Sequence, residues 1–402
     1  MKEELQLVQY PRKPGKKSDL SFMNLDHAKK VQKFHSGFPV YQKTPLTELR
    51  ETAKMLGLGT VYIKDESYRF GLNAFKVLGG SYAIGRCLAE RLGKSIEEMS
   101  YEELVSDQTR KKLGDITFVT ATDGNHGRGV AWTAKKLGQK AVVYMPKGSV
   151  QERLDRIREE GAQASITELN YDEAVRLASR QAEQKGWVMV QDTAWDGYED
   201  IPRWIMQGYG TMGYEAYTQL PEKPTHIFLQ AGVGSMAGAV AGFFSSVYKE
   251  ERPVITVVEP AKADCIFRTA KAADGALHFV TGTMDTIMAG LACGEPCSIG
   301  WNVLKDYADN FISCPDYMAA EGMRILGNPA GKDSRIISGE SGAAAFGCVA
   351  AIMRNQKYTD IRTKLGLSEH SRVLFFSTEG DTDKENYRSI VWDGTYAKPQ
   401  EV

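Results

Sequence analysis

Short apolar runs rich in β-branched residues alternate with longer helical patterns along almost the whole chain. The predicted strands cover residues 61–64, 116–120, 141–145, 165–167, 188–191, 226–229, 254–258 and 373–376. Helical patterns lie between them, for example over 150–160 and 171–185. Such alternation predicts an α/β fold with mostly parallel strands. Ligands of such sheets bind at the carboxyl ends of the strands, so chemically active residues are expected there.

The charge balance excludes some classes of partner. Among 402 residues, 50 are Lys or Arg and 51 are Asp or Glu, which gives a formal net charge of -1. No overall positive field is available to hold a nucleic acid or an anionic membrane surface. No segment approaches the roughly 18 consecutive apolar residues of a membrane span. We therefore expect no nucleic-acid partner and no membrane partner.

The six cysteines are scattered along the chain. They form no CxxC pair and no Cys/His cluster with ligand spacing, so no metal site is expected. Reduced thiols and a cytoplasmic location are the default for this pattern. Pairing of Cys265 with Cys293 or Cys297 across a loop stays open.

A glycine-rich segment follows the predicted strand at 226–229. It reads Gly232-Val233-Gly234-Ser235-Met236-Ala237-Gly238 and leads into a helix of small residues. Glycines let backbone amides approach an anion closely, and the helix adds the positive end of its dipole. Three interpretations stay open: a site for a single phosphate, a dinucleotide site with Glu259 as the ribose-binding acid, and a structural tight turn.

Lys76 stands in unusually apolar surroundings. Leu72, Ala74 and Phe75 precede it, and Val77, Leu78 and two glycines follow. Desolvation would lower the pKa of the lysine and free its amine for imine formation. The alternative is a lysine at a helix edge whose charged end extends to solvent.

Five segments stand in a fixed order between about residues 40 and 383. They are Thr44-Pro45-Leu46, Asn73-Ala74-Phe75-Lys76, Thr122-Asp123-Gly124-Asn125-His126-Gly127, Gly232 to Gly238, and Ser377-Thr378-Glu379-Gly380-Asp381. Together they resemble the fold-type II pyridoxal-phosphate family, although Asn73 stands where that family usually has serine. The resemblance implies two three-layer α/β/α domains with pyridoxal 5'-phosphate in the cleft between them. Residues 1–80 and 197–402 would form the larger domain, and 81–196 the smaller.

Three longer stretches, 64–76, 122–129 and 190–195, are similar to the diaminopropionate ammonia-lyase subgroup of that family. This resemblance implies α,β-elimination of 2,3-diaminopropionate, in both its D and L forms, to pyruvate and ammonia. It also implies a homodimer.

The resemblance further implies the roles of the cofactor-binding residues. Lys76 would carry the cofactor and, once released, accept the α proton. Asn125 would bind the ring O3′, and Ser377 would face the ring nitrogen. The phosphate would be held by the backbone amides of Gly232, Val233, Gly234, Ser235, Met236 and Ala237.

Asp123 departs from the wider family, which usually has a small residue there. By resemblance, the backbone amides of Thr122, Asp123 and Gly124 bind the substrate carboxylate. An aspartate in this loop would repel a plain amino acid but attract one that carries a β-ammonium. It also offers a second base on the face opposite Lys76, which would let one site act on both enantiomers. The alternative is an Asx turn that caps the next helix.

Three further side chains could each have either a functional or a structural role. Asp192 follows a predicted strand and would contact a substrate amine, unless it makes structural hydrogen bonds. Glu340 would either approach the cofactor ring or cap a helix. His126 is expected to pack behind the cofactor, because Lys76 already fills the role of base.

Several functions compete with this elimination. A serine or threonine dehydratase is the close rival. Asp123 favours diaminopropionate elimination over this alternative, because serine and threonine lack a β cation. A nicotinamide-dependent oxidoreductase would use the glycine segment and Glu259. A non-catalytic amino-acid-binding protein would not need the imine-forming Lys76.

Overall fold

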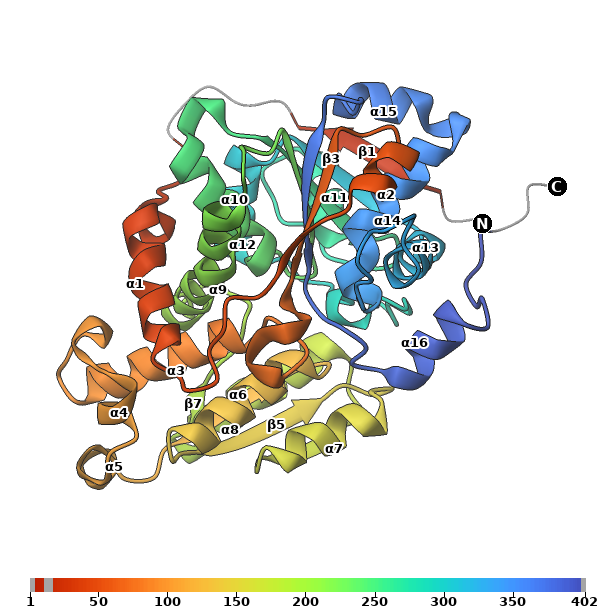
Figure 1. Ribbon diagram of the computed structural model, residues 1–402. Coiled ribbons are helices and arrows are strands. Elements are labelled where there is room, and N and C mark those ends of the chain that lie inside the picture. Colours follow the sequence, from red (N-terminus) through yellow and green to blue (C-terminus); the bar gives the residue numbers. More distant parts are fainter. Residues whose placement is uncertain (1–3, 11–16, 399–402) are drawn as a thin grey trace.

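Residues 4–10 and 17–398 are described in a computed structural model of the chain (Figure 1). Within these residues there are two β-sheets. The larger sheet has the order β1 (Gln6–Gln9), β10 (Asn310–Cys314), β9 (Val254–Pro260), β8 (His226–Gln230), β11 (Arg372–Ser377), β3 (Thr60–Asp65), β2 (Leu46–Glu48). The smaller sheet has the order β6 (Gln163–Ile166), β5 (Lys140–Met145), β4 (Thr117–Ala121), β7 (Val188–Met189).

The edge strands β1 and β2 pair antiparallel with β10 and β3, and the other pairs are parallel. The predicted α/β class with mostly parallel strands is therefore confirmed. The helices are α1 (Leu25–Ser36), α2 (Arg50–Met55), α3 (Val77–Arg91), α4 (Tyr101–Leu104), α5 (Asp107–Leu113), α6 (Asn125–Lys136), α7 (Gln151–Glu159), α8 (Tyr171–Lys185), α9 (Asp200–Gln219), α10 (Ser235–Tyr248), α11 (Cys265–Ala272), α12 (Ser298–Tyr307), α13 (Asp316–Gly327), α14 (Glu340–Arg354), α15 (Thr359–Leu365) and α16 (Lys384–Val391).

Both faces of the larger sheet are covered by helices. Along β8, Ile227 and Leu229 join the core on the side of α9 and α10, whereas Phe228 joins the core on the side of α13 and α14. Figure 1 shows these two helix groups on either side of the sheet. A strand that is buried on both faces has a continuous run of apolar residues in its sequence. For this reason the sequence pattern predicted β8, β9 and β11.

The strand predictions failed where polar side chains are buried. We did not predict β10, because its strand contains Asn310 and Ser313. Both are buried and satisfied: Asn310 donates to Thr256, and Ser313 donates to Asp264. The short edge strands β1 and β2 were also missed. Strand β7 ends at Met189, two residues before the predicted end, because the side chain of Gln191 accepts the backbone N–H of Ala121.

Helix α3 lies against α9 of the larger body and α6 of the smaller one. Two glycines permit the contact with α9. A Cβ at Gly79 would lie 2.6 Å from the side chain of Ile205, and one at Gly208 would lie 2.3 Å from the carbonyl oxygen of Leu78. Because α3 begins directly after Lys76, this close packing fixes the lysine relative to both sheets.

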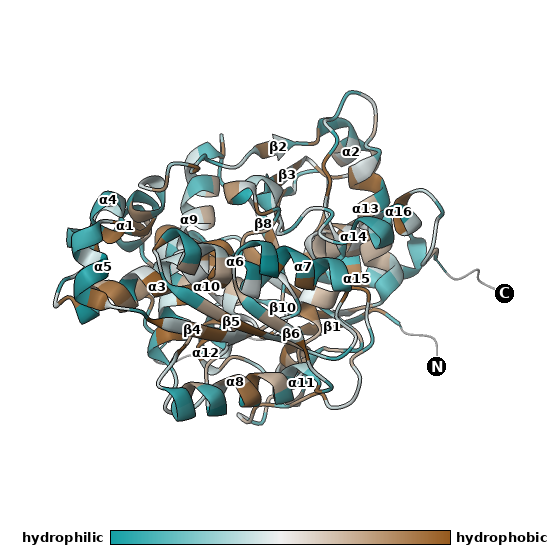
Figure 2. Cartoon of the chain, turned by 90° about the horizontal axis from the view of Figure 1, so that it is seen from below, coloured by the Kyte–Doolittle hydropathy of each residue, from teal (hydrophilic) through white to brown (hydrophobic). Residues whose placement is uncertain are grey.

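The smaller sheet lies with α6, α7 and α8 in the lower part of Figure 1. Figure 2 shows its strands β4 and β5 in hydrophobic colours, whereas α8 beside them carries hydrophilic turns. Among the described helices, none is both long enough and apolar enough to span a membrane. The division at residues 81 and 196 stays a prediction, and we propose this sheet as the centre of the smaller domain.

Candidate active site

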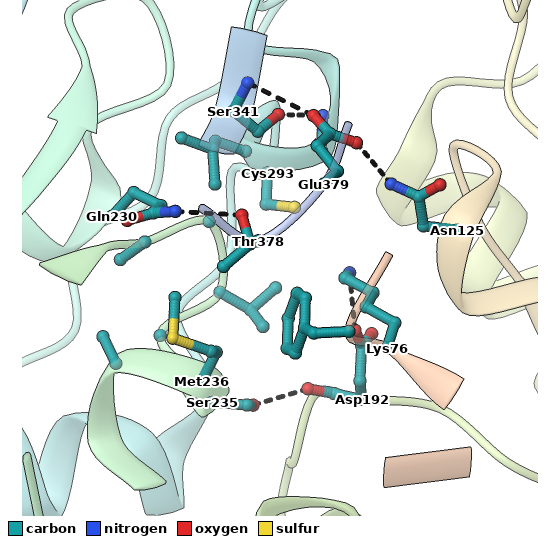
Figure 3. Close-up of a pocket in the computed structure, with 18 of the residues that line it drawn as sticks. Lys76, Asn125, Asp192, Gln230, Ser235, Met236, Cys293, Ser341, Thr378 and Glu379 are labelled. Carbon is teal, nitrogen blue, oxygen red and sulfur yellow. Dashed lines mark hydrogen bonds and ion pairs between the residues drawn. The ribbon is translucent and has the colours of Figure 1, made fainter. Parts of the chain in front are cut away.

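A cavity opens where the carboxyl ends of strands from both sheets meet (Figure 3). The glycine segment follows β8, Thr378 and Glu379 follow β11, and Asp192 comes shortly after β7. The cavity is lined by Phe75, Lys76, Asn125, Tyr171, Asp192, Tyr209, Gln230, Ala231, Gly232, Val233, Gly234, Ser235, Met236, Ala237, Gly290, Leu291, Cys293, Ser341, Thr378 and Glu379.

The amine of Lys76 is paired in this cavity. Its Nζ atom lies 2.8 Å from Oδ2 of Asp192. Burial by itself lowers the pKa of the lysine, but the nearby carboxylates of Asp192 and Asp123 outweigh it and raise the pKa above its ordinary value. Our expectation of a lowered pKa is therefore wrong for this state, because it considered desolvation without the charge partners that the fold supplies.

Asp192 is held in one orientation by several groups. Its Oδ1 accepts from the side chain of Gln191 at 3.3 Å and from the hydroxyl of Tyr171 at 3.5 Å. Burial favours the neutral acid, but Lys76 and His126 favour the carboxylate and bring its pKa down to about 2. The Asp192 side chain is therefore an anion throughout the physiological range.

His126 lies behind this pair and away from the cavity. Its side chain is buried, and its Nε2 lies 2.8 Å from the carbonyl oxygen of Val190. Burial lowers the pKa of the imidazole, so it is neutral at physiological pH. This position agrees with the expected packing role.

The glycine segment forms the turn from β8 into α10, and its residues 232–237 all line the cavity. Gly234 has φ +93°, a conformation that favours glycine, and a Cβ there would lie 2.5 Å from Cδ1 of Ile266. No side chain caps α10, and the first amides of a helix have no partner within it. The segment thus presents free N–H groups and a helix N-terminus to the cavity, as an anion site requires.

Glu259 cannot serve as a ribose-binding acid. It is fully buried, and its carboxylate accepts the backbone N–H groups of Ile266 and Phe267 at the start of α11. Burial also raises its pKa well above the ordinary value. The dinucleotide interpretation is therefore wrong, because the acid at the expected spacing is used to hold a helix.

The loop after β4 has a structural part and a part that faces the cavity. The hydroxyl of Thr122 accepts the N–H groups of Gly124 at 2.9 Å and Gly127 at 3.1 Å, so this side chain shapes the turn. Thr122 and Gly124 do not line the cavity, but Asn125 does, and its amide donates to Glu379.

Asp123 does not line the cavity itself but lies beside Gly290, one of the lining residues. Its Oδ2 is 3.4 Å from the guanidinium of Arg153 and would be 3.6 Å from a Cβ at Gly290, which lines the cavity. Asp123 and Lys76 influence each other electrostatically. The structure thus brings together the lysine and both aspartates that the sequence singled out.

Ser377 does not face the cavity. It is buried, and its hydroxyl donates to Ser338 at 2.8 Å. The next residue, Thr378, lines the cavity and accepts from the side chain of Gln230 at 2.9 Å. The expectation that Ser377 faces the cofactor is therefore wrong, because alternate side chains at a strand end point to opposite faces.

Glu340 also lies away from the cavity. It is the first residue of α14, is buried, and accepts the side-chain amide of Asn386. Burial and the neighbouring Glu379 raise its pKa to about 7. Glu340 therefore fits neither alternative: it does not reach the cavity, and the N-cap of α14 is Gly339, with no side chain capping the helix.

The sequence did not single out several lining residues. Tyr171 starts a predicted helix, and Tyr209 lies within α9, where an aromatic residue is usually part of the core. Within the described residues, the hydroxyl of Tyr209 and Oε1 of Gln230 are buried in the cavity wall without a hydrogen-bond partner. Unsatisfied buried polar atoms are rare in folded proteins, so these two indicate a polar ligand in the cavity.

The described part of the chain contains neither of the disulfide pairings that the sequence left open. Cys265, Cys293 and Cys297 are all unpaired thiols.

Comparison with known proteins decides the family. The model of the family described as pyridoxal-phosphate dependent enzymes matches residues 38–376. The chain belongs to this family. A diaminopropionate ammonia-lyase of Salmonella typhimurium is 53% identical over 391 residues, which cover 96% of this chain and 97% of that protein.

Solved structures agree with this membership. The crystal structure of holo diaminopropionate ammonia-lyase from Escherichia coli has a TM-score of 0.92 and 47% identity, covering 98% of this chain and 99% of that chain. Another structure of that enzyme, in complex with D-serine, has a TM-score of 0.91 and 47% identity, covering 98% of each chain. The predicted fold type and cofactor are thereby confirmed.

The residues of the cavity fit pyridoxal phosphate. Lys76 offers an amine for its aldehyde, and the amides at the start of α10 offer a cradle for its phosphate. The unpartnered atoms of Tyr209 and Gln230 offer further polar contacts. A Cβ at Gly234 would meet Ile266, which does not line the cavity, so glycine here allows the tight turn that places the backbone groups at the cavity wall.

Proposed function

We propose that this protein catalyses α,β-elimination of 2,3-diaminopropionate, in its D and L forms, with water to give pyruvate and two molecules of ammonia. The observation that carries the proposal is the presence of two carboxylates, Asp123 and Asp192, beside Lys76. A site with this charge favours an amino acid that brings a second ammonium group. The name of the Salmonella relative supports the same substrate.

Pyridoxal phosphate, when bound, supplies the electron sink for removal of the α proton and departure of the β amine. We assign Lys76 to carry it covalently, Asn125 to its ring oxygen, and Thr378 to its ring nitrogen. The amides of residues 232–237 would hold the phosphate. A threonine hydroxyl is a neutral partner, which suits an elimination in which the leaving group departs before much carbanion charge accumulates.

Lys76 and Asp192 divide two tasks. Released from the cofactor, the Lys76 amine accepts the α proton of the L isomer. The carboxylate of Asp192 then binds the ammonium of the substrate, whose positive charge replaces that of Lys76 beside it. This exchange of partners is possible because the Lys76 amine already lies 2.8 Å from that carboxylate.

Asp123 serves the D isomer as the second base. Its carboxylate lies beside Gly290, one of the lining residues, whereas Lys76 contacts Asp192. When the carboxylate and amine of the substrate are held fixed, inverting the α carbon moves its hydrogen away from the lysine. Two bases on different elements therefore account for turnover of both enantiomers.

Substrate comparison tests this proposal. We expect kcat/KM for D- and L-diaminopropionate to exceed that for D- and L-serine by roughly 10- to 100-fold, the value of one charge-assisted hydrogen bond. Pyruvate release from all four compounds is measured on one enzyme preparation. Serine turnover equal to or faster than that of diaminopropionate would favour a dehydratase.

We also propose that the enzyme is a cytoplasmic homodimer. The buried, unpaired cysteines are in keeping with a reducing compartment. Size-exclusion chromatography with light scattering would give twice the chain mass of 44.5 kDa. A single chain mass at micromolar concentration would contradict the dimer.

A further inference from the structure

Asp123 lies next to Arg153, a contact that no sequence motif predicted. Arg153 lies in the first turn of α7, and its side chain is 8% exposed. Its Nη1 atom lies 3.4 Å from Oδ2 of Asp123, and Nη2 lies 3.5 Å from the hydroxyl of Thr382. Among the described residues, this guanidinium is the one hydrogen-bonding partner of the Asp123 carboxylate.

The stem of Arg153 also packs on the loop that carries Asp123. Gly124 has φ +152°, and a Cβ there would lie 3.0 Å from Cδ and 3.4 Å from Cβ of Arg153. The arginine therefore touches the loop in two ways, through its methylene groups and through its charge. These two contacts can be separated by substitution.

Thr382 connects Arg153 to the opposite side of the site. The hydroxyl of Thr382 donates to Oε2 of Glu379 at 3.3 Å, and Glu379 accepts the amide of Asn125. Asp123 and Asn125 come from the smaller sheet, and Glu379 follows β11 of the larger one. Arg153 thus belongs to a chain of polar contacts that joins both sheets around the 122–125 loop.

We propose that Arg153 is a positioning residue that holds the Asp123 carboxylate for the reaction of the D isomer. This inference rests on the proposed function, in which Asp123 is the base for that isomer. A carboxylate on a short loop can rotate, and displacement of a reacting group by about 1 Å costs on the order of 10²-fold in rate. Lys76 does not depend on Arg153, so the L reaction keeps its base.

Arg156 is a matched control. It stands one turn further along α7 and lines a small second cavity together with Arg153 and Gly124. Its guanidinium donates to the carbonyl oxygen of Thr382 at 3.0 Å. Its other partner is Glu152, and no hydrogen bond or ion pair joins it to Asp123 within the described residues. Substituting it removes a similar charge from the same helix without releasing Asp123.

The test measures kcat/KM for D- and L-diaminopropionate in wild type, Arg153→Met, Arg153→Lys and Arg156→Met. Methionine keeps the stem on Gly124 but removes the guanidinium. We expect Arg153→Met to lower the D reaction by about 10²-fold and the L reaction by less than about 10-fold. Arg153→Lys should restore part of the D reaction, and Arg156→Met should leave the D/L ratio unchanged.

Equal losses of both isomers in Arg153→Met, or a fall of the D/L ratio in Arg156→Met as well, would overturn the proposal. If Arg153→Met does not fold, Arg153→Lys provides the test. A D/L ratio of kcat/KM in Arg153→Lys equal to that of the wild type would also overturn the proposal. Failure of the proposed function itself would appear differently, as a wild type that does not turn over either isomer. Absorbance of the bound cofactor in each variant verifies that the site is assembled.

Discussion

The Nζ atom of Lys76 lies 2.8 Å from the Oδ2 atom of Asp192, and this contact joins the residue that precedes α3 to the segment that follows β7. Lys76 is thereby held at the point where the two sheets face each other. The same contact keeps the amine charged before the cofactor binds, since the carboxylate raises the pKa of the lysine against the effect of burial.

Lys76→Ala should abolish turnover of every amino acid, because both the covalent attachment and one base are lost. The expected fall in kcat is at least about 10²–10⁴-fold, the value of a general base. Borohydride reduction of the wild-type enzyme, followed by peptide mapping, should locate the cofactor on Lys76. Lys140→Ala, at an exposed surface ion pair, is the control. Near-normal activity of Lys76→Ala without added amines would exclude this lysine.

Asp123→Asn should separate the enantiomers. Asparagine keeps the shape but cannot accept a proton, so the D reaction should fall by about 10²–10⁴-fold. The L reaction loses only attraction to the β-ammonium, about 1–3 kcal/mol. Pyruvate release from each isomer at one pH measures both effects. Equal losses would mean that Asp123 only binds substrate or shapes the loop, and a larger loss for L would mean that the two bases are assigned to the wrong isomers.

Gly234→Ala should weaken binding of pyridoxal phosphate. The new Cβ would lie 2.5 Å from Ile266, and overpacking of this kind costs about 1–3 kcal/mol, or roughly 10- to 100-fold in Kd. Gly148→Ala is the control, because Gly148 also has a positive φ, +85°, but no atom within 4 Å of its Cβ position. Titration of the apoprotein with the cofactor, followed by absorbance, gives both constants. Equal affinities of Gly234→Ala and Gly148→Ala for pyridoxal phosphate would contradict a role for the contact with Ile266.

Glu340→Gln should change the dependence of stability on pH. Burial and Glu379 raise the pKa of Glu340 from 4.5 to about 7 in the folded chain. The unfolded chain therefore loses this proton at lower pH than the folded one, so the wild type loses stability as the pH rises from about 5 to 7. The loss is at most about 3 kcal/mol.

Thermal unfolding of both proteins between pH 5 and pH 8 checks this expectation. The Tm of Glu340→Gln relative to wild type should rise over that range and level off above about pH 7. Glu385→Gln, at an exposed position on α16, serves as the control. Parallel pH curves for wild type and Glu340→Gln would mean that Glu340 ionises normally.

Much of the fold was predictable because its signal is local. Strands β8, β9 and β11 are buried on both faces, so their apolar runs are continuous and visible in the sequence. The turn from β8 into α10 was equally visible, because a tight anion-binding turn needs glycine at positions such as Gly234. Strand β10 was missed because its buried Asn310 and Ser313 are satisfied by partners that lie far away in the sequence.

The sequence by itself determined the α/β class and the glycine turn, and it singled out Lys76, Asp123 and Asp192, since each of these depends on residue type and short spacing. Only the tertiary structure decided that Lys76 pairs with Asp192, that Thr378 rather than Ser377 faces the cavity, and that Glu259 holds α11. It also revealed Arg153 beside Asp123. The physical reason is that charge pairing and side-chain direction depend on distances between segments that the chain brings together only on folding, and a one-residue step along a strand end reverses the face.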